Sequence, residues 1–362
     1  RSRPLPVNDR LMKPSLSLLT ACLLLGACSQ SQPRPDSAVV PGAAWQSPHA
    51  LTHQLDNTHW WTHFASPELN RLIAQARAGN YDLAAAVARV QQAQASAVIA
   101  GAPLLPEIKL GGSGNREKLL CGKGYSQLDA SDDNKAVDYF DANLTASYEV
   151  DFWGGKTAAR DSALHALKSS EFDQATVELT VLSSVASLYV QTLAFDEQLR
   201  IAQLNLANAL RVLHVVKTRY DAGSTTALEL AQQESLVASQ QRQMPLVAQQ
   251  AQEARITLAA LLGQPVQQLA PSSTSFAQLH WPSIGSGLPS ELLSRRPDIA
   301  SAEAKLAAAQ ADITVARAAM LPSLTLSATL GSGADRLGDL LRSPFYNLTA
   351  GLAAPIFNNG RL

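Results

Sequence analysis

The chain has 362 residues, of which 46% are hydrophobic and 16% charged, and its formal net charge at pH 7 is −1. Because Lys and Arg balance Asp and Glu, the composition gives no reason to expect a nucleic-acid partner. Aromatic residues make up only 6% of the chain, so the elements described below are built mainly from small and aliphatic side chains.

The N-terminal region resembles an export signal. Met12 is followed by Lys13 and by an apolar run over residues 16–25, which is typical of a removed secretory signal and too short for a membrane span. The run ends in Leu-Gly-Ala-Cys, which resembles a lipobox, so Cys28 is predicted to be lipidated as the first mature residue. The alternative is an ordinary small residue at a cleavage site. Ser29, rather than Asp, follows and implies release to the outer membrane.

A helical arm is predicted over residues 67–99, because apolar residues recur there at steps of three and four. Its apolar stripe consists of Leu69, Leu72, Ile73 and Ala76. His59 and His63, just before the arm, have the four-residue spacing of metal ligands on a helix. No further Cys or His follows at a useful distance, so no metal site and no cofactor are predicted.

Strands are predicted on either side of a polar insert. From Asn143 to Val150 polar and apolar residues alternate, and a period of two gives a strand one polar and one apolar face. A strand of a water-soluble sandwich would show the same pattern. For a membrane barrel, the lumen-facing residues would be Asn143, Thr145, Ser147 and Glu149, and the lipid-facing residues Leu144, Tyr148 and Val150.

A long helical hairpin is predicted next. Residues 157–222 contain neither Gly nor Pro, and a continuous helix of that length would be about 100 Å long. A second helix is predicted from about Leu228 to Leu262. The tip between them contains Gly223, Ser224, Thr225 and Thr226.

The second half of the chain repeats the first. A second arm is predicted over residues 289–320, and a second alternating strand follows. Its predicted lumen-facing residues are Ser323, Thr325, Ser327 and Thr329, and its lipid-facing residues are Leu324, Leu326 and Leu330. Four strands per chain are too few to close a barrel, and only closure removes sheet edges in a membrane. An oligomeric barrel fed by long helices is therefore predicted.

The repeat predicts how the chain is divided. We expect upstream residues and a signal peptide over 1–27, a lipidated extended segment over 28–65, and a first helix–strand–strand–helix repeat over 66–263. A linker over 264–288 and an incomplete second repeat over 289–362 follow. By internal symmetry roughly 100 further residues would complete the second repeat, so the chain is expected to be a fragment of a longer product or a damaged copy.

Three local features are predicted to be structural. The glycine runs at 111–114 and 331–333 lack the motifs of phosphate loops and are expected to be flexible turns at the barrel mouth. In the cluster Arg295-Arg296-Pro297-Asp298, Pro297 is expected to begin a helix with Asp298 in its first turn. Asp151, Phe152 and Trp153 are expected to mark an aromatic girdle where strand gives way to helix.

Several motifs together resemble one family. They are Leu-Leu-Ser-Arg-Arg-Pro-Asp-Ile at 292–299, Trp-Trp at 60–61, Glu-Val-Asp-Phe-Trp-Gly at 149–154, Arg-Tyr-Asp-Ala-Gly at 219–223 and Pro-Ile-Phe at 355–357. On these motifs the chain resembles the TolC/OprM-like outer-membrane efflux proteins, specifically the NodT-type lipoprotein branch of the RND tripartite efflux systems. The resemblance covers nearly all of the mature chain.

The resemblance implies a fold and a function. The fold would combine long α-helical hairpins, forming a periplasmic tunnel, with four strands per protomer, which a homotrimer completes to a twelve-stranded barrel in outer-membrane lipid. The function would be that of a passive duct, not an enzyme, exporting drugs or toxic compounds. A periplasmic adaptor would contact the tip at Gly223, Ser224, Thr225 and Thr226, and an inner-membrane RND-type transporter would supply the energy.

Other functions stay open at this stage. Drug and metal cargo cannot be separated by the residues present. A non-conducting structural lipoprotein anchored through Cys28, or a truncated non-functional copy, is the alternative to a duct. The alternating strands favour the duct, because a pure scaffold needs no lipid-facing strands.

Overall fold

The computed structural model describes residues 59–118, 136–282 and 290–357. The chain divides into two units, residues 1–44 and 45–362, and all described residues belong to the second unit. The predicted lipidation at Cys28 lies outside the described residues. The finer division of the chain at residues 27, 65, 263 and 288 stays a prediction.

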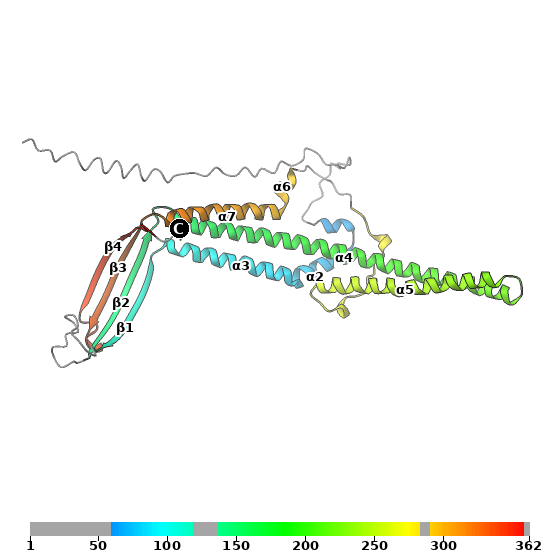
Figure 1. Cartoon of the computed structure of the whole chain (residues 1–362), viewed down its shortest axis with the longest axis horizontal. Coiled ribbons are helices and arrows are strands. Elements are labelled where there is room, and N and C mark those ends of the chain that lie inside the picture. Colours follow the sequence, from blue (N-terminus) through cyan, green and yellow to red (C-terminus); the bar gives the residue numbers. More distant parts are fainter. Residues whose placement is uncertain (1–58, 119–135, 283–289, 358–362) are drawn as a thin grey trace, which may run out of the picture. The chain divides into compact units, whose positions relative to one another are not determined.

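The described residues form long helices and one antiparallel sheet (Figure 1), as predicted for the fold class. The first repeat contains η1 (Trp60–Phe64), α2 (Pro67–Gly79), α3 (Tyr81–Gly101), η2 (Ala102–Leu104), β1 (Glu107–Glu117), β2 (Val137–Val150), α4 (Gly155–Asp221) and α5 (Ala227–Leu261). The connection contains η3 (Val266–Gln268) and η4 (Phe276–Gln278). The second repeat contains α6 (Glu291–Arg295), α7 (Pro297–Ala319), β3 (Ser323–Ala334), η5 (Leu337–Asp339) and β4 (Pro344–Ala353).

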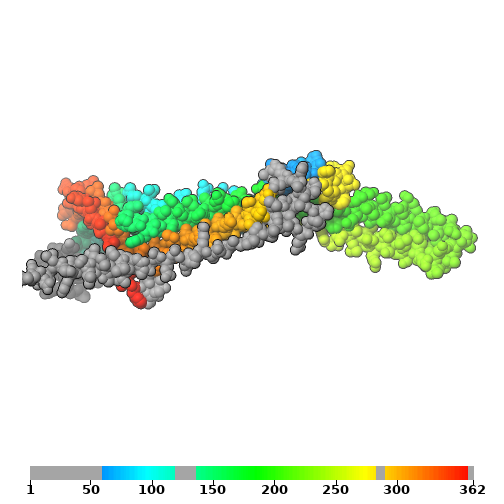
Figure 2. Space-filling view, turned by 90° about the horizontal axis from the view of Figure 1, so that it is seen from above, coloured from blue at the N-terminus to red at the C-terminus, as the bar shows by residue number. Residues whose placement is uncertain are grey.

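Helix α4 is the 67-residue helix that the sequence predicts. It packs against α3 and α7 and, beyond them, against α5 (Figures 1 and 2). Toward its start, the buried hydroxyls of Ser169 and Ser301 lie 3.0 Å apart and join α4 to α7. Further along, the Arg255 guanidinium donates to the Asp196 carboxylate at 2.7 Å and joins α5 to α4. The predicted antiparallel hairpin of α4 and α5 is therefore confirmed.

The core lies where α2 and the C-terminal end of α5 meet the middle of α4. The predicted stripe Leu69, Leu72, Ile73 and Ala76 is buried there, packed against Val181, Leu182, Val185, Tyr189, Leu193 and Leu258. By length and composition α4 is also apolar enough to cross a membrane, with a window of mean hydropathy 1.3. Because its apolar residues supply this core, we assign α4 to the helical packing and not to a span.

Both helical arms are interrupted where the sequence predicts continuous helices. Asn80 is extended, with ψ at 126°, and its side chain bonds in two directions. Its Oδ1 accepts the Leu83 N–H at 3.0 Å, and its Nδ2 donates to the Leu261 carbonyl at 2.8 Å. In the second arm Arg296 is extended because the following residue is Pro297. The prediction that Pro297 begins a helix with Asp298 in its first turn is confirmed.

The four strands form one sheet in the order β1-β2-β3-β4, with every neighbouring pair antiparallel. The outer edges of the sheet are β1 and β4. Within the described residues neither edge strand has a second partner, so the sheet is open as a single chain.

Candidate functional site

The register of the sheet gathers the predicted lipid-facing residues on one face. Leu144 pairs with Leu330, Tyr148 with Leu326, and Val150 with Leu324. Since side chains alternate along a strand, directly paired residues point to the same side. The two strands, which lie in different repeats, therefore present one common apolar face.

The predicted lumen-facing residues share the opposite face. Thr145 pairs with Thr329, Ser147 with Ser327, and Glu149 with Thr325. The hydroxyls of Thr145 and Thr329 lie 3.2 Å apart, within hydrogen-bond distance. The faces themselves are thus a structural finding, whereas their assignment to lumen and lipid stays a prediction.

Both outer strands extend these faces with residues that the sequence analysis did not single out. On the apolar face, Leu110 pairs with Leu144 and Leu352 with Leu324. The alternation Ile-Lys-Leu over 108–110 was a signal for this, but it is too short to be decisive alone. The added apolar residues are Ile108, Leu110, Tyr346, Leu348 and Leu352.

The apolar face is exposed rather than buried. Leu110 is 82% exposed, Leu348 73% and Leu352 74%. In a water-soluble sandwich, such a face would pack against a second sheet. Among the described residues, nothing packs over these leucines closely enough to bury them. Exposed apolar patches of this kind mark interaction surfaces.

The glycine runs lie inside strands, so the prediction that they form turns is wrong. Gly111 and Gly114 belong to β1, and Gly331 and Gly333 to β3. Each is covered by a side chain of a neighbouring strand. A Cβ on Gly331 would lie 2.8 Å from the Phe345 ring, and a Cβ on Gly114 would lie 3.1 Å from the Phe140 ring. The glycines therefore make room for side chains that lie across the sheet.

The junction between β2 and α4 is held by Asp151. Gly154, the residue at the N-cap of α4, has φ at 71° and no side chain to cap the helix. The Asp151 carboxylate caps the helix instead. It accepts hydrogen bonds from the N–H of Lys156 at 3.0 Å, the N–H of Thr157 at 2.8 Å and the Thr157 hydroxyl at 2.7 Å. Partial burial raises the pKa of Asp151, but these hydrogen bonds and the Lys156 charge lower it by more, so its pKa lies below the ordinary value.

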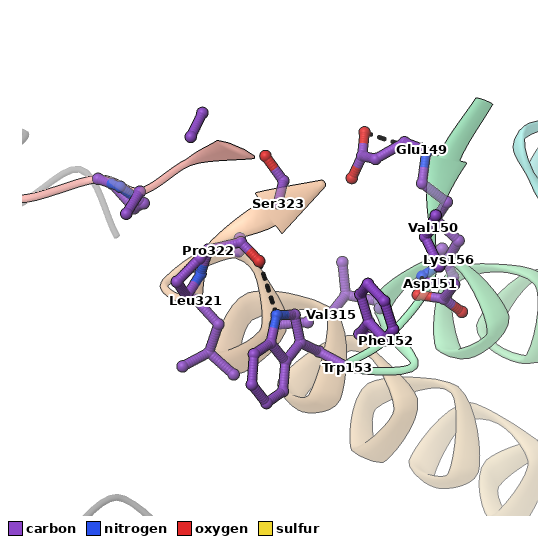
Figure 3. A pocket seen from close by; sticks show the side chains of 17 residues that line it. Glu149, Val150, Asp151, Phe152, Trp153, Lys156, Val315, Leu321, Pro322 and Ser323 are labelled. Atoms are coloured by element: carbon purple, nitrogen blue, oxygen red, sulfur yellow. Dashed lines mark hydrogen bonds and ion pairs between the residues drawn. The ribbon is translucent and has the colours of Figure 1, made fainter. Parts of the chain in front are cut away.

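Trp153 joins the two repeats at the same junction. Its indole N–H donates to the carbonyl of Pro322, just before β3, at 2.7 Å (Figure 3). A pocket of about 670 Å³ lies here and is lined from both repeats. On one side of it, Lys156 of α4 pairs with Glu149 of β2 at 3.2 Å. Phe152 is 65% exposed and Trp153 47%, so the aromatic pair predicted at this position presents its rings to the surroundings.

The hairpin tip has a complete helix-ending motif. Gly223 has φ at 71°, and its N–H donates to the Tyr220 carbonyl while the Ser224 N–H donates to the Arg219 carbonyl. These two bonds form a Schellman motif, in which Gly supplies the left-handed conformation. Thr226 then caps α5 by accepting the Glu229 N–H, and the Thr225 hydroxyl donates to the Glu229 carboxylate.

The tip is exposed and holds its polar groups in place. Gly223, Ser224 and Thr226 are exposed and Thr225 is half-buried. Beside them the apolar side chain of Leu228 is 68% exposed, a feature of the tip that the sequence did not single out. The position of the tip is as predicted, and its contact with an adaptor stays a prediction.

The remaining motifs have local roles. Within the part of the chain that the structure describes, no group of three or more His, Cys, Asp and Glu residues could hold a metal ion. His59 instead packs edge-on to Trp61, with 5.3 Å between the rings. Arg296 pairs with Asp298 through two hydrogen bonds of 3.0 and 2.6 Å, which raises the pKa of Arg296 and lowers that of Asp298.

Comparison with known proteins gives consistent matches. The model of the family described as "Outer membrane efflux protein" matches residues 72–264 and 288–362. The pyoverdine export outer membrane protein OpmQ of Pseudomonas aeruginosa is 60% identical over 96% of this chain and 74% of its own length. The probable outer membrane lipoprotein SilC of Salmonella typhimurium is 30% identical over 96% of this chain and 73% of its own length.

Solved structures match in the same way. A crystal structure of CusC, described in terms of folding and transmembrane channel formation, superposes with a TM-score of 0.76 at 27% identity. The superposition covers 89% of this chain and 74% of that one.

Proposed function

Because the chain belongs to the outer membrane efflux protein family, we propose that it acts as a passive duct for pyoverdine or a compound of the same class. It is an outer-membrane efflux protein, and outer-membrane efflux channels are transport proteins rather than a family of enzymes. The proposal adds the cargo, the assembly and the partners.

The observation that carries the proposal is the pair of faces on the sheet. One face is mainly apolar and carries many exposed side chains, and the other carries the Ser, Thr and Asn side chains together with Glu149. A strand in a membrane barrel needs this division, because it contacts lipid on one side and water on the other. The apolar face faces lipid in our proposal, and the polar face lines the duct.

The open edges support an assembly of three copies. Backbone groups at a free edge cannot remain unpaired in lipid, so β4 of one copy pairs with β1 of the next. Three copies with four strands each would close a twelve-stranded barrel. A duct of this kind holds no energy source, so the proposed transporter in the inner membrane drives the export.

The internal repeat predicts a register between copies. Asn-Leu-Thr-Ala occurs in β2 and again in β4, and Leu-Pro precedes both β1 and β3. Transferring the β2–β3 register onto β4 and the neighbouring β1 sets Thr349 opposite Ser113 of the next copy, since Thr145 pairs with Thr329. The transferred register keeps polar residues on one face.

The hairpin tip is the proposed contact for the periplasmic adaptor. Gly223, Ser224, Thr225 and Thr226 expose polar groups beside the apolar Leu228, a combination suited to a small protein contact. The lipid anchor at Cys28 is proposed from its lipobox, and the lipoprotein relative SilC supports it.

Cysteine cross-linking tests the assembly. Thr349→Cys is combined with Ser113→Cys in a chain in which Cys121 is replaced by Ser. Oxidation is expected to give cross-linked oligomers up to a trimer. Thr349→Cys with Gly112→Cys is the matched control, because these side chains would lie on opposite faces. Equal cross-linking of Thr349→Cys with Ser113→Cys and with Gly112→Cys would contradict the proposal. So would the absence of cross-linking when Thr349→Cys is combined with Ser113→Cys or with its same-face neighbours Gly111→Cys and Asn115→Cys.

An export assay tests the cargo. A Pseudomonas strain that lacks its own pyoverdine export outer-membrane protein is given this chain, and pyoverdine is measured in the medium and in the periplasm. We expect the compound to move from the periplasm to the medium. Unchanged periplasmic accumulation, with the chain present in the outer membrane, would rule out this cargo for the chain.

A further inference from the structure

One end of the polar face carries two aromatic rings that reach over glycines of the neighbouring strand. The Phe345 ring covers Gly331, where an added Cβ would lie 2.8 and 3.1 Å from two of its carbons. The Tyr139 ring covers Gly333, where an added Cβ would lie 3.1 and 3.2 Å from two of its carbons. Neither glycine has a positive φ, so backbone conformation does not explain why both positions lack a side chain.

The two rings reach over the same strand from the strands on its two sides. Tyr139 belongs to β2 and Phe345 to β4, and β3 lies between them. Gly331 and Gly333 are two residues apart in β3 and face the same side, so the ring sites are about 7 Å apart. Tyr139 is 45% exposed and Phe345 48%. The outer end of each ring therefore lies over glycine backbone, and about half of each side chain remains exposed.

Hydrogen-bonding groups lie beside the rings. Asp141 pairs with Gly333 across the β2–β3 ladder and so shares the face of the rings. Its carboxylate accepts the Ser113 hydroxyl and, at 3.1 Å, the Asn143 amide, which hold it in place. Because this carboxylate is held next to two half-exposed aromatic rings, it can accept a hydrogen bond from a molecule that stacks on them.

We propose that Tyr139 and Phe345 form an aromatic platform on the duct wall, which binds planar aromatic groups of the cargo by stacking. The proposal rests on the proposed function for the orientation of the polar face toward the lumen. Stacking on half-exposed rings is weak, which suits a duct, because cargo that is held tightly cannot leave. Asp141 would favour aromatic groups that carry a hydrogen-bond donor or a positive charge.

Direct binding tests the platform independently of conduction. The chain in lipid nanodiscs is titrated with N-methylquinolinium and, separately, with its fully saturated ring analogue of equal charge, and saturation-transfer NMR gives the dissociation constants. The aromatic probe is expected to bind about two- to tenfold more tightly than the saturated one. Tyr139→Leu and Phe345→Leu are each expected to reduce this preference, because each keeps the apolar contact and removes the ring.

Phe140→Leu is the matched control. Phe140 is the neighbour of Tyr139, and its ring also covers a glycine, Gly114, but on the apolar face. The control is expected to keep the preference for the aromatic probe. Equal binding of the two probes, or an equal loss in Phe140→Leu, would overturn the platform. An aromatic preference in a chain that exports nothing would overturn the duct and leave the platform standing.

Discussion

Gly263, at the end of α5, makes the tightest backbone contact among the described glycines. Its φ is 69°, and an added Cβ would lie 2.1 Å from the Gly79 carbonyl oxygen. Gly223, at the end of α4, has nearly the same φ of 71° and the same pair of helix-ending hydrogen bonds, but an added Cβ there meets nothing within 4 Å. The two positions therefore separate backbone strain from steric overlap.

The expected loss of folding free energy differs between Gly223→Ala and Gly263→Ala. At Gly223 the left-handed conformation costs about 1–2 kcal/mol, and the stiffer unfolded chain returns about 0.4–1 kcal/mol, so a net loss of about 1 kcal/mol is expected. At Gly263 the overlap must also be relieved by moving backbone. Overpacking of this kind adds about 1–3 kcal/mol, which gives a loss of about 2–4 kcal/mol for Gly263→Ala.

Amide hydrogen exchange of the protein in detergent, read out by mass spectrometry, measures the local loss of stability in each variant. In Gly263→Ala, peptides from α2 and from the end of α5 should lose protection, because Gly79 is the group that must move. In Gly223→Ala the loss should be confined to the hairpin tip. Equal losses in the two variants, or unchanged protection of α2 in Gly263→Ala, would refute the close approach of Gly79 and Gly263.

Two further predictions concern polar contacts. The folded-state pKa of Asp151 is lowered, so its hydrogen bonds stabilise the fold above the unfolded pKa of about 3.9, and this stability is lost as pH falls through the lower folded pKa. Asp151→Asn should flatten that acid loss in a thermal unfolding series between about pH 5 and 2, and an unchanged pH profile would contradict it. Ser301 is 1% exposed and bonds both Ser169 and, at 2.6 Å, Asp173, so Ser301→Ala should cost about 1–3 kcal/mol in a denaturant titration, whereas Lys305→Ala, which removes an exposed ion pair with Asp173, should cost less than about 1 kcal/mol.

The faces of the strands and the position of the hairpin tip could be predicted because each depends on local periodicity. Alternation along 143–150 fixes which residues share a side, whatever the strand pairs with. A run without Gly or Pro predicts a long helix, and Gly223 predicts its end. The pairing of Leu144 with Leu330 could not be predicted in the same way, since it joins residues far apart in the chain.

The features that sequence reasoning missed depend on tertiary contacts. Asn80 interrupts the first arm because its amide reaches the Leu261 carbonyl of another helix. The strand glycines were mistaken for turn residues because Gly is common in turns. These positions are glycine because a ring or an amide of the next strand occupies the space of a side chain, and this can be recognised only once the register is known. Apolar side chains of the second arm are also more exposed than those of the core, with Leu306 and Ile313 near 45% exposure.

The measurement that tests the account most directly asks which face of the sheet contacts lipid. Thr325→Cys and Leu326→Cys, adjacent in β3, each carry a spin label in a Cys121→Ser chain reconstituted in lipid. The account predicts that the label at position 326 is relaxed mainly by oxygen, which concentrates in lipid, and the label at position 325 mainly by a water-soluble nickel complex. Equal relaxation at both positions, or the reverse assignment, would contradict a duct with a polar lumen.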